Sequence, residues 1–179
     1  MKVVLSPEKF YQLINYGPCC IVSSGNKKIK NFAPIAWVTP LNDEPPLVIV
    51  CVATTHYTSY LINKYKEFVV NVPSVDMLSV VRKSGEISGK TKDKFELLKV
   101  KCEPGKKINT VHLSDCIGFI EAKLSFRKEF SGVNLFVGSV VYCEVEKDVY
   151  QNYIIPQKAK TLHHVGGSQF FVSSKVVKL

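Results

Sequence analysis

The sequence predicts a mainly β protein, a closed or nearly closed antiparallel barrel that carries a few short helices. Short β-branched runs bounded by Gly, Pro or Asn recur along the chain, which is typical of strands. Only three stretches carry helical signals, too few to cover both faces of a parallel sheet. Many strands with short connections therefore favour a barrel.

The expected strands are short, apart from one long hairpin. Four of them have the sequences CCIVSS (19–24), APIAWVT (33–39), PLVIVCVA (46–53) and EFVVNV (67–72). A hairpin of 116–130 and 134–146 is expected, because apolar and polar residues alternate in its first arm and Ser131–Gly132 supply a turn. The late run SQFFVSS (168–174) is a candidate for closing the sheet.

The helical stretches are 58–67, 74–85 and 91–100. The first is expected to start at Thr58 or an earlier threonine, and the second to run from a capping Ser to a terminal Gly. No linker, repeat or low-complexity segment interrupts the 179 residues. We therefore expect residues 1–179 to form a single domain.

Composition argues against several classes of protein. The net charge is +9, but arginine is rare and the lysines are scattered, so we expect no nucleic-acid partner; an anionic small ligand explains the charge equally well. No apolar run reaches the ~20 residues that span a bilayer, and the N-terminus lacks a signal peptide's apolar core. We expect a cytoplasmic protein without a membrane partner. The six cysteines lack metal-ligand spacing, so buried reduced thiols and no metal are expected.

The stretch GEISGKT (85–91) is one residue short of the phosphate-binding P-loop, G-x-x-x-x-G-K-[ST]. A P-loop leaves a buried strand and opens a helix, whereas the residues before Gly85 are predicted to end a helix. No β–α–β alternation follows, so we exclude a P-loop. A Rossmann nucleotide site is also excluded, because G-x-G-x-x-G does not occur.

Five segments of the chain occur in a characteristic order. They are NFAPIAWVTP (31–40), PPLVIVCVATTHYTSYLI (45–62), EFVVNVPS (67–74), SGKTKDKFE (88–96) and LFVGSVVYCEV (135–145). Together they resemble the flavin reductase-like family of FMN-binding split barrels, especially its flavoredoxin and archaeal ferric-reductase-like members. The resemblance covers residues 15–172. It implies a six-stranded antiparallel Greek-key split barrel and a homodimer with one FMN in each of two sites near the interface.

Two residues match the family segment N-x-x-x-x-x-W, whose side chains lie against the isoalloxazine ring. They are Asn31 and Trp37. A Trp supplies a flat apolar face, and an Asn can satisfy ring donors and acceptors together. From the residues alone, Trp37 is equally well explained as a core residue.

The hydroxyl-rich stretch ATTHYTS (53–59) lies between a strand and a helix. Such a helix N-terminus can bind the phosphate of FMN. Thr58 matches the family's binding threonine. The other expected contacts in this stretch are Ala53, Thr54, Thr55 and Ser59. Ordinary helix capping explains the hydroxyls as well.

According to the resemblance, the Ser88–Gly89 part of GEISGKT begins the family segment S-G-x-x-x-D-K-F. Ser88, Gly89 and Lys94 then become expected FMN contacts, and Lys90 a variable loop residue. A cation near the phosphate or the reduced ring would favour bound FMN. Without the resemblance, Lys94 would be interpreted as a solvated surface lysine.

Two further FMN contacts are expected from later segments. Phe170, or its neighbour Phe171, matches an aromatic residue near the flavin, and Asn134 stands where close relatives often carry His. His163 and His164 are adjacent, so on an extended segment they would point to opposite sides, which disfavours a metal site. A structural or flavin-edge role is expected for them.

The function implied by the resemblance is that of an FMN-dependent oxidoreductase of the flavin reductase or flavoredoxin type. NAD(P)H would supply reducing equivalents to flavin, ferric complexes or a partner redox protein. No catalytic side chain is expected, because hydride and electron transfer are the cofactor's chemistry. The alternative is a flavoprotein electron carrier without its own NAD(P)H activity. A third hypothesis, a structural or nucleic-acid-binding barrel without FMN, rests only on the basic charge.

Overall fold

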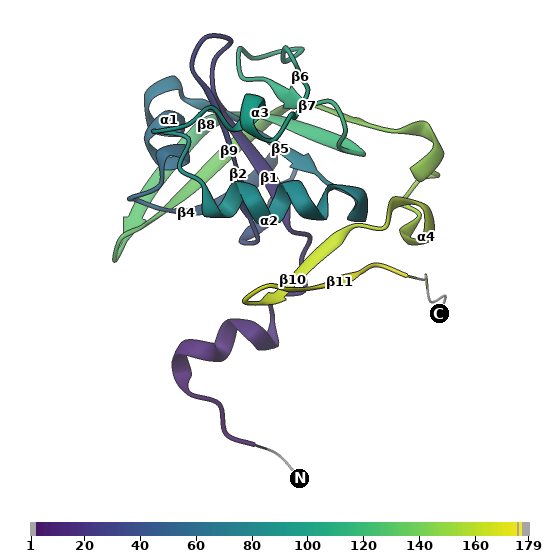
Figure 1. The fold of residues 1–179 in the computed structure, drawn as a ribbon. Helices are drawn as coiled ribbons and strands as arrows, with labels where there is room; N and C mark the ends of the chain where they lie inside the picture. Colours follow the sequence, from purple (N-terminus) through teal and green to yellow (C-terminus); the bar gives the residue numbers. More distant parts are fainter. Residues whose placement is uncertain (1–2, 175, 177–179) are drawn as a thin grey trace.

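The protein is described here from a computed structural model that covers residues 3–174 and 176 (Figure 1). Its main element is a seven-stranded antiparallel sheet in the order β2-β1-β5-β8-β9-β4-β3. The strands are β1 (Cys20–Gly25), β2 (Lys30–Ile35), β3 (Val38–Asp43), β4 (Pro46–Ala53), β5 (Glu67–Val72), β8 (Gly118–Phe130) and β9 (Val133–Val145). The predicted β architecture is confirmed, with seven strands in this sheet instead of six.

The additional strand arises where a single strand was expected at 33–39. The chain leaves β2 after Ile35 and enters β3 at Val38, so Ala36 and Trp37 cross from one end of the strand order to the other. Strand β2 also approaches β4. The sheet therefore curls until β2 lies beside β4, with which it is not paired, and this seam between β2 and β4 is where the barrel is split.

The long hairpin is confirmed as β8 and β9. Its turn residues, Ser131 and Gly132, both have positive φ, at 45° and 84°. Two such residues make a turn whose twist matches that of the strands it joins. The run at 168–174, in contrast, does not close the barrel. Its strand β11 (Gln169–Val172) pairs only with β10 (Leu162–Gly166), as a separate hairpin below the barrel in Figure 1. The prediction that this run closes the sheet was wrong. The apolar side chains of β11 suit either partner, so they did not indicate which one it pairs with.

The helices lie near the expected positions but differ at their ends. They are η1 (Pro7–Leu13), α1 (Tyr57–Tyr65), η2 (Val75–Met77), α2 (Leu78–Glu86), α3 (Lys94–Leu97), η3 (Lys147–Val149) and α4 (Pro156–Ala159). The N-cap of α1 is His56, so the expected cap, Thr58 or an earlier threonine, was wrong. Gly85 lies inside α2, one residue before its end, and the third expected helix shrinks to the single turn of α3. A further two-stranded sheet is formed by β6 (Cys102–Glu103) and β7 (His112–Leu113).

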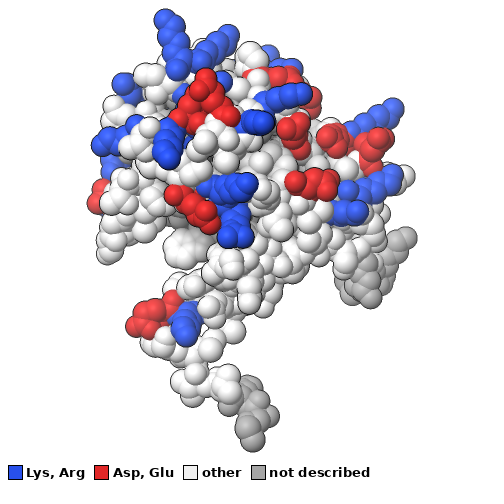
Figure 2. Space-filling view, viewed as in Figure 1, with Lys and Arg blue, Asp and Glu red and all other residues white. Residues whose placement is uncertain are grey.

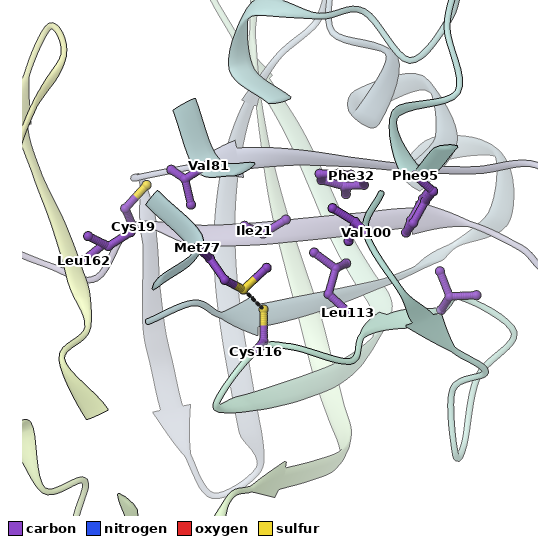
Figure 3. Packing of buried hydrophobic residues seen from close by; sticks show 11 residues of the cluster. Cys19, Ile21, Phe32, Met77, Val81, Phe95, Val100, Leu113, Cys116 and Leu162 are labelled. Carbon is purple, nitrogen blue, oxygen red and sulfur yellow. Dashed lines mark hydrogen bonds between the residues drawn. The ribbon is translucent and has the colours of Figure 1, made fainter. Parts of the chain in front are cut away.

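The two faces of the sheet are covered by two apolar clusters. One fills the barrel and includes Val22, Phe68 and Phe136. The other lies between the sheet and α2, where Ile21, Phe32, Met77, Val81 and their neighbours pack together (Figure 3). Strand β1 is buried along its whole length because it contributes alternate residues to both clusters. The packing fixes β2 and α2 relative to each other, and these two elements form one wall of the candidate site.

The six cysteines differ in burial. All six are unpaired. Cys19, Cys20 and Cys116 are buried, and burial raises the pKa of each thiol. Cys143 is exposed, contrary to the expectation of burial. No helix in the described part of the chain has the length and apolar character needed to cross a membrane.

A buried histidine should make the stability of the fold depend on pH. The His112 ring stacks on Phe119 at 3.8 Å between centroids. Burial lowers the pKa of His112 below its usual 6.5, with the nearby Glu103 carboxylate opposing the shift. The unfolded chain therefore binds a proton more readily. Stability should be intact above about pH 6.5 and fall as the pH drops through the unfolded and then the folded pKa.

Thermal midpoints measured across this pH range test the prediction. His112→Phe keeps an aromatic ring on Phe119 but removes the titrating group, so its midpoint should change less with pH. Equal pH profiles for wild type and variant would contradict the assignment.

Candidate functional site

A polar cavity of about 360 Å³ opens between β2, the start of α1 and the segment that joins α2 to α3. It is lined by Asn31, Ala33, Pro34, Thr55, His56, Tyr57, Thr58, Ser84, Gly85, Glu86, Ile87, Ser88, Gly89 and Lys94. Six of these were expected contacts: Asn31, Thr55, Thr58, Ser88, Gly89 and Lys94. The fold therefore brings together three segments that are far apart in the sequence.

Asn31 lies at the centre of this arrangement. Its Nδ2 donates a hydrogen bond of 2.9 Å to Thr58 Oγ1, while its buried Oδ1 has no hydrogen-bond partner. A Cβ on Gly89 would collide with the Asn31 side chain, so a glycine is required there. A buried acceptor without a partner is costly, and a ligand with a hydroxyl or N–H donor would satisfy Oδ1.

Lys94 is buried in the wall of the cavity and does not belong to the solvated surface. Its ammonium donates to Phe32 O at 2.9 Å and to Ser84 O at 2.7 Å, which joins β2 to the end of α2. Burial lowers the pKa of Lys94 to about 8. An ammonium has three donors, so one remains for a ligand. Lys90 is exposed and does not line the cavity.

The first turn of α1 presents two buried hydroxyls, each held by an asparagine. Asn31 from β2 donates to Thr58, and Asn134 from β9 donates to Ser59 Oγ at 2.6 Å. Arg127 Nε in turn donates to Asn134 Oδ1 at 2.7 Å. Because each hydroxyl accepts one bond from an amide, each keeps its own hydrogen available to donate.

Not all the expected phosphate contacts lie at the cavity. Ser59 and Asn134 lie behind it and fix the position of α1. Ala53 ends β4 opposite Val133, and the Thr54 backbone N–H donates to Gly132 O at 2.8 Å. Ala53 and Thr54 therefore anchor the strand end to the β8–β9 turn and do not line the polar cavity.

A second cavity of about 570 Å³ adjoins the first and shares Pro34, Gly85 and Glu86 with it. Trp37 and Phe170 line it, together with Tyr11 from η1. The Trp37 side chain is 47% exposed, so its interpretation as a core residue is wrong. This cavity is less polar than the first and offers flat aromatic faces.

The two histidines of β10 point to opposite sides, as expected. His163 stacks on Phe171 at 4.5 Å, whereas His164 packs against Phe170 and lines the second cavity. His163 Nδ1 lies 2.8 Å from Tyr16 O. Among residues 3–174 and 176, no group of three or more His, Cys, Asp or Glu side chains is arranged to hold a metal.

The positive charge is dispersed. On the face drawn in Figure 2, Lys and Arg lie among carboxylates over the barrel, while the lower part that carries β10, β11 and η1 is mostly uncharged. The face in view has no continuous basic patch of the kind that follows a nucleic-acid backbone. The buried Lys94 is the cation that the fold directs to the cavity.

Comparison with known proteins identifies the family. Residues 15–168 match the family model described as "Flavin reductase like domain". The chain belongs to this family. An uncharacterized protein of Archaeoglobus fulgidus is 32% identical over 141 residues, which are 79% of this chain and 77% of that protein.

Solved structures of similar proteins share the fold. The flavoredoxin of Methanosarcina acetivorans superposes with a TM-score of 0.89 at 22% identity, over 100% of this chain and 95% of that one. The FMN-binding protein of Thermus thermophilus, solved with 1-cyclohex-2-enone, gives 0.86 at 21% identity, over 100% and 98%. These likenesses confirm the split-barrel fold.

Part of the polar cavity's lining was missed in the sequence. Ser84, Gly85, Glu86 and Ile87 line the polar cavity from the end of α2. In the structure a Cβ at Gly85 would approach the Pro34 ring to 3.2 Å, so the glycine allows α2 to pack closely on β2. The GEISGKT stretch thus belongs to the cavity wall through both of its glycines.

Proposed function

We propose that this chain binds FMN non-covalently and is an FMN-dependent oxidoreductase that accepts reducing equivalents from NAD(P)H. The observation that carries the proposal is the pairing of two adjoining cavities, one rich in donors and one lined by aromatic faces. FMN has the matching halves, an anionic phosphate with a hydroxylated chain and a flat ring system. Family membership supports the same assignment.

The polar cavity would hold the phosphate end of FMN. Lys94 offers a buried positive charge, Thr58 a hydroxyl donor, and the first turn of α1 the positive end of its backbone dipole. Thr55 and Ser88 add hydroxyls at the mouth of the cavity. Ser59 and Asn134 would act indirectly, by holding the first turn of α1 in place.

Asn31 and the second cavity would orient the remainder of FMN. The unpartnered Oδ1 of Asn31 suits a hydroxyl or N–H donor of the ligand and would repel a phosphate oxygen. Trp37 and Phe170 offer apolar faces to the ring.

Bound FMN would supply the hydride or electron transfer, and the protein would bind it, orient it and limit its contact with water. No side chain is assigned an acid–base role. Ala53 and Thr54 are proposed only as supports of the site, because they anchor the β4 end. The acceptor is proposed to be free flavin, a ferric complex or a partner redox protein. The six unpaired cysteines support a reducing, cytoplasmic location.

We expect the purified protein to carry FMN, or to bind it when FMN is added, and to release it on heating or acidification. Absorbance spectra before and after adding FMN measure this. Anaerobic mixing of the FMN-loaded protein with NADH and with NADPH then tests the reductase assignment, because the flavin absorbance should bleach. FMN binding without bleaching by either donor would favour the electron-carrier alternative. Failure to bind FMN at all would contradict the proposed function.

A homodimer is also proposed. The segment before β1 extends away from the barrel, and no side chain of η1 is buried (Figure 1). Leu13 and Ile14 are 65% and 73% exposed, and Val4 is 99% exposed. Several exposed apolar side chains on one segment favour an interface.

Light scattering should therefore give twice the chain mass of 20.1 kDa at micromolar protein. Ile14→Glu should shift the protein toward monomer, whereas Lys9→Glu, on an already polar position of the same segment, should not. A wild-type monomer with FMN bound would refute the dimer.

A further inference from the structure

Lys30 and Cys102 form a close amine–thiol pair that lines neither the polar cavity nor the second cavity. Lys30 is the first residue of β2 and Cys102 the first of β6, which belong to different sheets. The Lys30 Nζ lies 3.2 Å from Cys102 Sγ. It also lies over the Phe95 ring, 4.6 Å from its centroid. Two contacts from separate segments thus hold the amine beside the sulfur.

We propose that Lys30 and Cys102 are an oxidative modification site, at which hydrogen peroxide drives formation of a covalent sulfur–nitrogen bond between the two side chains. In the first step the Cys102 thiolate attacks peroxide. An S–O bond forms and the O–O bond breaks, and the departing hydroxide takes up the proton that the thiol lost and leaves as water. The sulfur is thereby oxidised to a sulfenic acid and the peroxide is reduced.

In the second step the lone pair of the Lys30 nitrogen attacks that sulfur. An S–N bond forms, the S–O bond breaks, and the departing hydroxide takes a proton from nitrogen to leave as a second water. The balance is one thiol, one amine and one peroxide giving one sulfenamide and two waters. Sulfenic acids condense with a backbone nitrogen to form a sulfenamide, and here the Lys30 amine is the nitrogen within reach of the sulfur.

The surroundings of the other cysteines make Cys102 the site. Cys19, Cys20 and Cys116 are buried, and their raised pKa values keep them as unreactive thiols. Cys51 is half-buried, and burial raises the pKa of its thiol. Cys143 is exposed, but among the described residues no lysine is hydrogen-bonded to the sulfur of Cys51 or of Cys143. Cys102 is half-buried, so a small oxidant can reach it while the amine stays in contact.

The bond would join two strands that are separated by 72 positions in the chain. Lys30 precedes Asn31, and Phe95 follows Lys94, so the crosslink would lie directly behind the polar cavity. A crosslink that closes a long loop restrains the unfolded chain. The oxidised protein should therefore unfold at a higher temperature than the reduced one.

The test uses the full chain, exposed to a small excess of hydrogen peroxide and then analysed by intact mass and peptide mapping. We expect a species lighter by two hydrogens, a peptide that joins residues 30 and 102, and reversal by a thiol reductant. In Lys30→Arg, which keeps the positive charge over Phe95, Cys102 should instead gain oxygen and be trapped by a sulfenic-acid reagent. Cys102→Ser should yield no crosslink.

Three results would overturn the proposal. They are oxygen addition at wild-type Cys102 without a crosslink, a crosslink to a different lysine, and oxidation of Cys143 while Cys102 stays reduced. Peptide mapping of the oxidised wild-type protein alone distinguishes these outcomes, so the proposal can be tested even if a variant does not fold. Because peroxide is added directly, the result is independent of whether the proposed flavin chemistry is correct.

Discussion

Replacing Lys94 by alanine should weaken FMN binding about ten- to hundred-fold, the equivalent of losing a charge-assisted hydrogen bond of roughly 1.5–3 kcal/mol. Lys90→Ala should leave the affinity almost unchanged. Lys94 is buried with one donor free at the cavity, whereas Lys90 is exposed and outside it. Titration of each protein with FMN by fluorescence quenching measures the difference.

Lys94 also holds two backbone carbonyls, Phe32 O and Ser84 O, so its removal should lower stability as well. Lys94→Met, which keeps the aliphatic stem, and circular dichroism of each variant separate lost binding from lost folding. Equal losses for Lys90 and Lys94 would mean that general positive charge attracts the phosphate. A larger loss at Lys90 would mean that this loop is wrongly assigned.

The pH dependence of binding provides an independent check. The pKa of Lys94 in the free protein is about 8, so the amine loses its charge above that pH and FMN binding must take up a proton. Wild-type affinity should therefore fall as the pH rises through 8. The phosphate is already fully ionised there, so Lys94→Met should show no such fall.

Gly89→Ala should reduce FMN affinity at least about tenfold, because overpacking at a close contact costs ~1–3 kcal/mol. The added methyl would collide with the Asn31 side chain. Either Asn31 turns away and breaks its bond to Thr58, or the loop that carries Ser88 moves. FMN titration and thermal unfolding of the variant measure the two consequences.

Gly17→Ala is the matched control, since a Cβ at Gly17 would meet only Val38 O at an ordinary 3.8 Å. It should change neither FMN affinity nor stability appreciably. Combining Gly89→Ala with Asn31→Ala should recover stability without affinity, because the collision is relieved while the acceptor is still absent. Unchanged affinity in Gly89→Ala would show that FMN does not depend on this contact.

Local patterns predicted the parts of the fold that depend on neighbours in sequence. The β8–β9 hairpin followed from alternation and from a turn at Ser131–Gly132, and both act within a few residues. The pairing of β11 was not predictable in this way, because its apolar residues suit the barrel or β10 equally. Tertiary contacts decide which strand β11 pairs with, and the β-propensity of its residues does not predict those contacts.

The site shows the same limit. The Thr58 hydroxyl was expected to cap α1, but a hydrogen bond from Asn31, 27 residues earlier, occupies it. Lys94 would pass for a surface lysine without the family resemblance, because its burial depends on carbonyls of β2 and α2. Composition and local sequence pattern do not indicate hydrogen-bond partners that are this distant in sequence. Family segments located the polar cavity, yet they did not indicate that Ala53 and Thr54 stand outside it.

Asn31 and Asn134, which bind the first turn of α1, connect that helix to strands on both sides of the split. Asn31 belongs to β2 at one end of the strand order. Asn134 belongs to β9, whose paired neighbour β4 lies on the other side of the split from β2. A ligand bound between β2 and α1 would therefore restrain the motion of β2 relative to β4 at the seam. The amide hydrogens of β2 should exchange with solvent more slowly once the cavity is filled, while those of the already enclosed β5 should scarcely change.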